Sequence, residues 1–159
     1  MRAIYPGSFD PITLGHLDII KRTLGIFEEL TVLIANAENK KYLFSPQERK
    51  QMTQECLKKV KGVTVDLWDG LTVEYLRKQK VNVIVRGLRG FSDFDNEWVI
   101  AQTNKSLYPE VETVFVISTL EHSTIASRIV KEIALNDGPL EGLVPPSVIL
   151  KLKNKFKKR

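Results

Sequence analysis

Residues 5–16 have the types and the spacing of a phosphate-binding turn. Two glycines and two prolines in this stretch fix an unusual backbone path. Gly15 and His16 then place an imidazole in the first turn of a predicted helix, where free amide groups and the helix dipole attract anions. The alternative is an ordinary strand-to-helix turn that Thr13 caps. The combination of a hydroxyl group, a glycine-rich turn and a helix start favours a phosphate site.

Further basic side chains follow predicted strands. Lys40 lies in the polar stretch 36–41, and Arg86 and Arg89 follow the apolar run 81–85. Solvated surface explains a single lysine in such a loop, and surface salt bridges are the alternative for the two arginines. Guanidinium groups bind phosphate oxygens in a bidentate manner, which favours a phosphate-binding role for the arginines.

The elements that must position these residues alternate between strands and helices, which is typical of a parallel sheet with crossover helices. Strands are predicted at residues 3–5, 30–35, 63–67, 81–85 and 113–117. Helices are predicted from apolar spacing or capping signals around residues 17–27, 46–60, 71–80, 94–101, 125–133 and after Pro145-Pro146. Trp98 is expected in the core.

These elements predict an α/β fold, a Rossmann-like doubly wound sheet of about five parallel strands with flanking helices and a C-terminal helix. A single domain is expected over residues 1–159. In such folds ligands bind outside the carboxyl ends of the strands, which is where the candidate residues fall.

The net charge of +5 comes from the C-terminal tail, residues 151–159. The tail has six basic residues and no acidic ones, so the remainder has 18 basic against 19 acidic residues, a net charge of −1. We interpret the tail as a solvated helix face. No nucleic acid and no membrane partner is expected, and RNA contact through the tail is the weaker alternative.

A cytoplasmic protein is expected, because no signal sequence or membrane-spanning run is visible. Cys56 is the only cysteine, which fits a reducing compartment, and it is expected to fill the core. Since His16 and His122 lie in different loops, no cluster with metal-ligand spacing is present in the sequence.

Thr13-Leu14-Gly15-His16 resembles the His-x-Gly-His signature of the nucleotidyltransferase superfamily, with threonine in place of the first histidine. The stretch from Pro6 to Pro11 resembles the phosphopantetheine adenylyltransferase family in particular. The resemblance continues, in order, through Lys40-Lys41, Arg86 to Arg89, Asp93-Phe94, Glu97, Asn104 and Val130-Lys131-Glu132.

This resemblance implies that ATP reacts with 4′-phosphopantetheine to give dephospho-coenzyme A and pyrophosphate. The family's reaction is an in-line attack on the α-phosphate without a covalent enzyme intermediate, so the protein positions the substrates and stabilises charge. Mg²⁺ is expected to arrive on the ATP phosphates with most of its waters. The family is typically hexameric, so the resemblance also implies a homo-oligomer.

The resemblance implies a role for each matching residue. His16 and Lys40 are the implied catalytic residues. Binding of the acceptor is assigned to Ser8, Lys40, Thr72 (largely through its backbone) and Arg86. Binding of ATP is assigned to Ser8, Phe9, His16, Gly87, Leu88, Arg89, Glu97, His122, Ser123, Thr124, Ile125, Ala126, Ser127 and Arg128.

The segment 122–128 departs from the family pattern, which usually has an aromatic residue, then serine, and later Ile-Ser-Ser-Ser. His122 stands at the aromatic position, and Ala126 and Arg128 replace two of the three serines. Backbone amides at the start of the predicted helix can still hold ATP phosphates. The hydroxyl contacts at 126 and 128 do not carry over, and we hypothesise that Arg128 contacts the β- or γ-phosphate instead.

Two other functions are alternatives. A related transferase that uses nicotinamide mononucleotide or CTP should lack the pair Lys40 and Arg86. A binding protein on a retained fold would use the basic tail for RNA. A class I aminoacyl-tRNA synthetase shares the Gly-His signature, but a chain of 159 residues leaves no room for tRNA binding.

Overall fold

The computed structural model describes residues 1–37 and 40–157, apart from the side chain of Ser92. The strands are β1 (Arg2–Gly7), β2 (Glu29–Asn36), β3 (Val63–Asp69), β4 (Val83–Leu88) and β5 (Glu112–Ile117). The helices are α1 (Leu14–Thr23), α2 (Pro46–Leu57), α3 (Thr72–Gln79), α4 (Phe91–Leu107), the 3₁₀ turn η1 (Leu120–His122), α5 (Ser127–Leu135) and α6 (Pro146–Lys157).

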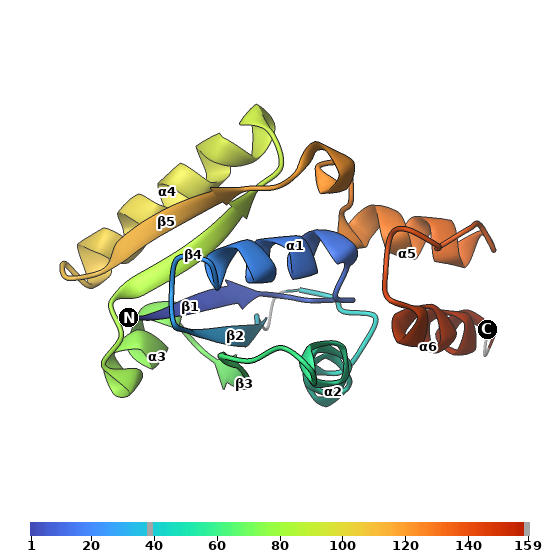
Figure 1. Ribbon diagram of the computed structural model, residues 1–159, viewed down its shortest axis with the longest axis horizontal. Coiled ribbons are helices and arrows are strands. Elements are labelled where there is room, and N and C mark those ends of the chain that lie inside the picture. The colour runs from blue at the N-terminus through green and yellow to red at the C-terminus, as the bar shows by residue number, and fades with distance from the viewer. Residues whose placement is uncertain (38–39, 158–159) are drawn as a thin grey trace.

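The five strands form one parallel sheet in the order β3-β2-β1-β4-β5. From β1 the chain moves outward to β2 and β3, and then crosses back to β4 and β5 (Figure 1). The strand order therefore reverses between β1 and β4, where ligands bind in doubly wound folds. The predicted fold class is confirmed.

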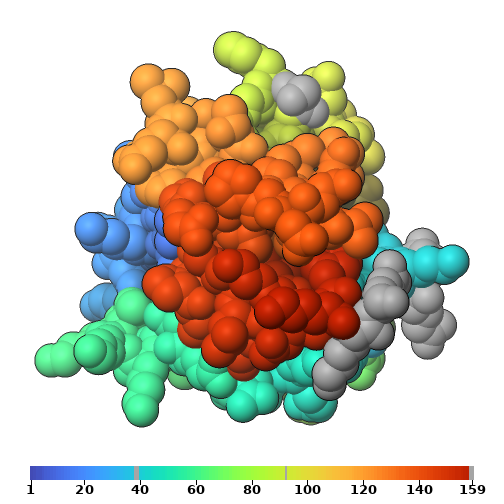
Figure 2. Space-filling view, turned by 90° about the vertical axis from the view of Figure 1, so that its right-hand side faces the viewer, coloured from blue at the N-terminus to red at the C-terminus, as the bar shows by residue number. Residues whose placement is uncertain are grey.

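The two faces of the sheet are covered by different helices because side chains alternate along each strand. Tyr5 of β1 packs in the core that α1, α2, α5 and α6 complete. Its neighbour Ile4 packs in a smaller core on the other face, with α3. Figure 2 shows α5 and α6 side by side over one end of the molecule.

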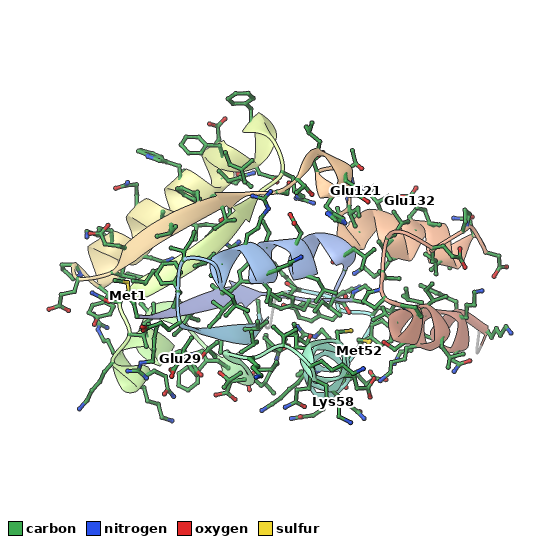
Figure 3. All side chains as sticks on the ribbon, in the orientation of Figure 1. Met1, Glu29, Met52, Lys58, Glu121 and Glu132 are labelled. Carbon is green, nitrogen blue, oxygen red and sulfur yellow. The ribbon has the colours of Figure 1, made fainter. Side chains whose placement is uncertain are left out.

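The pairing between β1 and β4 is confined to Ile4 opposite Ile84, whereas β1 and β2 are paired from Arg2 to Gly7. Beyond that pair the carboxyl ends of β1 and β4 separate, and the two strands diverge in Figure 1. Met1 and Glu29, labelled in Figure 3, mark the opposite, amino-terminal edge of the sheet. The separation opens space at the carboxyl edge.

Several predicted element bounds differ from the observed ones. The first strand includes Pro6-Gly7, and β4 runs to Leu88 because its pairing with β5 continues past the apolar run. Helix α5 begins at Ser127, after Ile125. Trp98 is half exposed and is not a core residue. Because apolar and polar residues are mixed on all sides of α4, its sequence pattern does not indicate which side faces the sheet.

The basic residues of the tail lie on a solvated helix face of α6, as interpreted from the sequence: Lys153 and Lys157 are exposed, and Lys151 and Lys155 are partly exposed. Leu152 is fully buried, and Lys151 and Lys155 pair with Glu55 and Glu48 of α2. Helix α6 is thus part of the packed structure rather than a free basic arm. The last two residues of the tail, 158 and 159, lie outside the described residues, as do residues 38 and 39 of the polar stretch before Lys40.

Candidate active site

A cavity of about 600 Å³ lies at the carboxyl ends of β1 and β4, where the strand order reverses. Its walls come from the β1–α1 loop, the first turns of α1, the end of β4, α4 and the start of α5. The predicted site residues that line it are Ser8, Phe9, His16, Lys40, Arg86, Gly87, Arg89, Glu97, Ile125, Ala126, Ser127 and Arg128. The structure therefore brings these twelve predicted residues together around one cavity.

Five predicted residues do not line this cavity: Thr72, Leu88, His122, Ser123 and Thr124. Thr72 opens α3 after β3, and Leu88 ends β4. His122 ends η1, where its Nδ1 lies 2.8 Å from Thr119 Oγ1. Their roles stay predictions.

The sequence interpretation missed Ser118, whose hydroxyl is buried in the cavity wall without a hydrogen-bond partner among the described residues. A signal for it was present. Ser118 directly follows the predicted fifth strand, and polar residues after parallel strands are candidates for ligand contact.

The start of α1 holds the imidazole of His16 in one orientation. Thr13 is the N-cap, and its Oγ1 accepts a hydrogen bond from the His16 amide at 3.3 Å. In return, the backbone N–H of Thr13 donates to Nδ1 of His16 at 3.1 Å. Since a backbone N–H can only donate, Nδ1 is the acceptor and the neutral ring carries its proton on Nε2. The capping residue thus selects the tautomer.

The surroundings of His16 also keep the ring uncharged. Burial against Phe9, whose ring centroid lies 4.9 Å away, and the positive charges of Arg89 and Arg86 lower the pKa of His16 to about 4. A neutral imidazole that carries its proton on Nε2 can donate a hydrogen bond from Nε2–H to a phosphate oxygen at physiological pH.

This environment predicts that His16 stays neutral through the physiological range. In a His122→Asn variant His16 is the sole histidine, so its imidazole resonances can be followed by NMR without overlap. The midpoint should lie near pH 4. The folded pKa is below the unfolded value, so this group's contribution to stability is complete above about pH 6.5 and decreases as the pH falls toward 4. A midpoint near 6.5 would contradict the prediction.

Arg86 bridges the separated ends of β1 and β4. Its Nη1 donates to the carbonyl oxygen of Pro6 at 2.6 Å. Its Nε and Nη2 donate to the two carboxylate oxygens of Glu97 on α4, each at 2.6 Å. Burial disfavours the charge, but the bonds to Glu97 raise the pKa of Arg86 above its ordinary value. The sequence did not indicate that these two residues pair with each other.

The pairing leaves Arg86 able to bind a ligand. A guanidinium has five N–H donors, and Pro6 and Glu97 use three of them. Two N–H donors of Arg86 remain for phosphate oxygens. The carboxylate of Glu97 fixes the plane of the guanidinium and therefore the direction of these two donors. Arg89 pairs in the same bidentate way with Asp93, with Nε 2.9 Å and Nη2 3.0 Å from its oxygens.

A second hollow of about 460 Å³ shares Ser8, Lys40 and Ser127 with the cavity. The cavity thus extends toward Lys131 and the β2–α2 loop. An acceptor lying there would reach the cations Lys40 and Lys131. Lys40 is exposed at the boundary of the two spaces.

Asp10 organises this side and was also missed. Its side chain is 3% exposed and accepts hydrogen bonds from the amides of Leu43 and Phe44 at 2.9 and 3.0 Å. Lys131 of α5 donates to the same carboxylate at 2.8 Å. Asp10 therefore ties together the β1–α1 loop, the β2–α2 loop and α5. The sequence signal that could have identified Asp10 is a carboxylate within a loop rich in glycine and proline.

The start of α5 lines the cavity with residues 125–128. Ala126 is the N-cap and provides no side-chain hydrogen bond to the helix. Ser127, the first helical residue, donates to the carbonyl oxygen of Pro11 at 2.8 Å, which fixes the helix against the β1–α1 loop. Arg128 follows, exposed at the cavity wall. This arrangement is suited to an anion.

A family model described as cytidylyltransferase-like matches residues 4–133. A phosphopantetheine adenylyltransferase from Carboxydothermus hydrogenoformans is 52% identical over 156 residues, which are 98% of this chain and 96% of that protein. Proteins of the same name from Dictyoglomus thermophilum and Bdellovibrio bacteriovorus are 50% and 49% identical, each over 98% of this chain and covering 95% and 98% of their own lengths. The chain belongs to the phosphopantetheine adenylyltransferase family.

The fold of this family member is found in more distant proteins as well. The crystal structure of a Vibrio parahaemolyticus protein described as a nicotinate-nucleotide adenylyltransferase has a TM-score of 0.72 at 16% identity, covering 99% of this chain and 96% of that one. At this identity the likeness concerns the fold alone.

In residues 1–37 and 40–157, no three or more histidine, cysteine or carboxylate groups lie close enough together to hold a metal ion. Of the helices described, none has the length and apolar character to cross a membrane.

Proposed function

We propose that this enzyme transfers the adenylyl group of ATP reversibly to 4′-phosphopantetheine, giving dephospho-coenzyme A and pyrophosphate. The observation that carries the proposal is one cavity that brings together the neutral imidazole of His16, the hydroxyl of Ser8 and the cations Lys40, Arg86 and Arg89. Its relatives at about half identity bear the name of this activity.

The chemistry follows from these groups. An oxygen of the acceptor phosphate attacks the α-phosphorus of ATP, a new P–O bond forms, and the bond to the β-phosphate oxygen breaks as pyrophosphate leaves. Negative charge grows on the α-phosphate oxygens, and His16 Nε2–H donates to one of them. Ser8, Lys40 and Arg86 hold the attacking phosphate. No side chain becomes covalently modified, so positioning and charge stabilisation provide the acceleration.

Mg²⁺ would be carried by the triphosphate rather than by a protein site. The cavity presents lysine, arginine and histidine donors, which suit phosphate oxygens and do not suit a hard cation. When bound, the ion neutralises charge on the leaving pyrophosphate. Among the described residues, the protein contributes lysine, arginine and histidine side chains, which would contact the phosphate oxygens that Mg²⁺ does not bind.

A pyrophosphate-release assay across acceptors and nucleotides tests the proposal. Release should require ATP and 4′-phosphopantetheine together, and pantetheine without its phosphate should not support it. Nicotinamide mononucleotide and CTP serve as the alternative substrates. Release with nicotinamide mononucleotide and none with phosphopantetheine would overturn the proposed acceptor.

Arg128 is proposed to bind the β- or γ-phosphate of ATP. Replacing it with alanine should raise the KM for ATP about tenfold, since a charge-assisted hydrogen bond contributes about 1.5–3 kcal/mol, while the KM for the acceptor stays nearly unchanged. Arg128→Ser, which restores the family's residue, should recover part of the loss. An unchanged KM for ATP in the alanine variant would remove Arg128 from the site.

A homo-oligomer, hexameric by resemblance, is part of the proposal. Large apolar side chains are exposed along α4: Phe91, Phe94, Trp98, Val99, Ile100 and Leu107. An apolar surface of this kind marks an interaction site. Light scattering should give the mass of six copies, and Trp98→Glu should lower it. A monomeric wild-type protein would contradict the assembly.

A further inference from the structure

Arg49 of α2 is a fully buried cation that pairs with no carboxylate of residues 1–37 and 40–157. Its side chain is 0% exposed, and the ion pairs of the described residues do not include it. Its Nε has no hydrogen-bond partner among those residues, and burial lowers its pKa below the ordinary arginine value. Arginine is almost never fully buried unless it is paired, because its charge is costly to remove from water. The burial of Arg49 with an unpaired Nε among the described residues therefore needs an explanation other than packing.

The acceptors that the described part of the chain offers to the Arg49 guanidinium are all neutral and lie beside the site. Nη1 donates to the carbonyl oxygen of Ser8 at 2.7 Å and to that of Ala35 at 3.1 Å. Nη2 donates to Oδ1 of Asn36 at 2.7 Å. The ring of Tyr42 stacks on the guanidinium, with its centroid 4.0 Å from Cζ. The side chain therefore connects the β1–α1 loop with the end of β2.

These two segments carry the groups that face the acceptor phosphate. Ser8 lines both the cavity and the adjoining hollow, and Lys40 does the same from the loop that follows β2. The hydroxyl of Tyr42 accepts a hydrogen bond from the amide of Ala37 at 3.0 Å, which links the chain after Lys40 to the end of β2. The position of Ser8 relative to Lys40 thus depends on contacts that converge on one guanidinium.

We propose that Arg49 is a positioning residue for the acceptor phosphate: its guanidinium holds the backbone of Ser8 and the end of β2 so that Ser8 and Lys40 bind one phosphate group. The planar fork reaches three acceptors at once, which the ammonium of lysine cannot reproduce in the same geometry. The proposal rests on the proposed function for the identity of that phosphate. The geometric link between the two segments does not depend on it.

The test compares Arg49→Lys with Met52→Ala, a destabilising change in the core of the same helix (Met52 is labelled in Figure 3). Arg49→Lys should raise the KM for phosphopantetheine about tenfold or more, as a small misplacement of binding groups does. The KM for ATP should rise by a smaller factor, because Ser8 is only one of the many residues assigned to ATP. Met52→Ala should leave both KM values unchanged. Equal KM values in the two variants would overturn the proposal.

A double-mutant cycle with Ser8→Ala adds a result that a purely structural role would not give. If Arg49 acts through Ser8, the loss caused by Ser8→Ala should be smaller in the Arg49→Lys background than in the wild type. Additive losses would contradict the proposal. Where Arg49→Lys fails to fold, Asn36→Ala removes one acceptor and should raise the acceptor KM in the same direction, and an unchanged value would count against the proposal.

Hydrogen exchange separates failure of this proposal from failure of the proposed function. Arg49→Lys should speed amide exchange in the peptides covering residues 5–10 and 40–44 relative to Met52→Ala, a measurement that needs no substrate. A wild-type enzyme without phosphopantetheine turnover would refute the proposed function alone. Unchanged exchange in both peptides would refute the positioning role alone.

Discussion

Replacing His16 with alanine is expected to lower kcat by about 10²–10³-fold, the usual effect of removing one donor to transition-state charge. The KM values for ATP and phosphopantetheine should change by only a few fold, because the Nε2–H contact strengthens mainly as charge grows on the α-phosphate. The capping contacts of Thr13 come from the protein itself and fix the tautomer, so the Nε2–H donor does not depend on the substrates. Steady-state kinetics with each substrate varied in turn measures both effects.

The matched control for this experiment is His122→Ala, since the chain has two histidines and His122 lies outside the cavity. It should retain most of the wild-type kcat, and the contact with ATP that the resemblance assigns to His122 should change only the KM for ATP. Thr13→Ala should fall between the two histidine variants, because it loses the Oγ1 contacts but keeps the imidazole. An intact kcat in His16→Ala together with weaker binding of both substrates would mean that His16 only binds them.

The second large effect is expected for Arg86→Met. Removing the guanidinium leaves the carboxylate of Glu97, 15% exposed, without its charged partner in the cavity wall. The free energy of unfolding should fall by about 3 kcal/mol, at the lower end for a buried pair because both side chains keep some contact with water. Turnover should fall as well, since two phosphate-binding donors disappear. Urea denaturation and kcat/KM for phosphopantetheine give the two measurements.

The double variant Arg86→Met and Glu97→Leu separates the two consequences. Removing both charges should recover most of the lost stability, because no uncompensated charge remains. Activity should not recover, because the donors to the phosphate are still absent. Recovery of both would mean that the pair serves the fold alone, and recovery of neither would mean that Glu97 is needed independently of Arg86.

The fold and the place of the site could be predicted from local signals. The alternation of apolar runs and helical spacing indicated the parallel sheet, and Thr13, Gly15 and His16 indicated the helix start at its carboxyl edge. The pairing of Arg86 with Glu97 could not be predicted, since it joins β4 to α4 through space. Arg49 was missed because one arginine in a polar helix segment is typical of a solvated face.

Other expectations stay predictions. The roles of the individual site residues, Mg²⁺ on the triphosphate and the hexamer belong to this group. So do the single domain over residues 1–159 and the cytoplasmic location. The half-exposed Trp98 shows why the assembly resists prediction: an apolar stripe in a sequence looks the same whether a core or a second subunit covers it.

The confinement of the β1–β4 pairing to Ile4 and Ile84 divides the sheet into two hydrogen-bonded blocks. One block is β3-β2-β1 and the other is β4-β5, and each has a continuous backbone ladder. A small rotation between the blocks would change the width of the cavity while breaking few backbone hydrogen bonds. Adjustment to substrate and product would therefore act on side-chain bridges, above all on the contact between Arg86 and the Pro6 carbonyl.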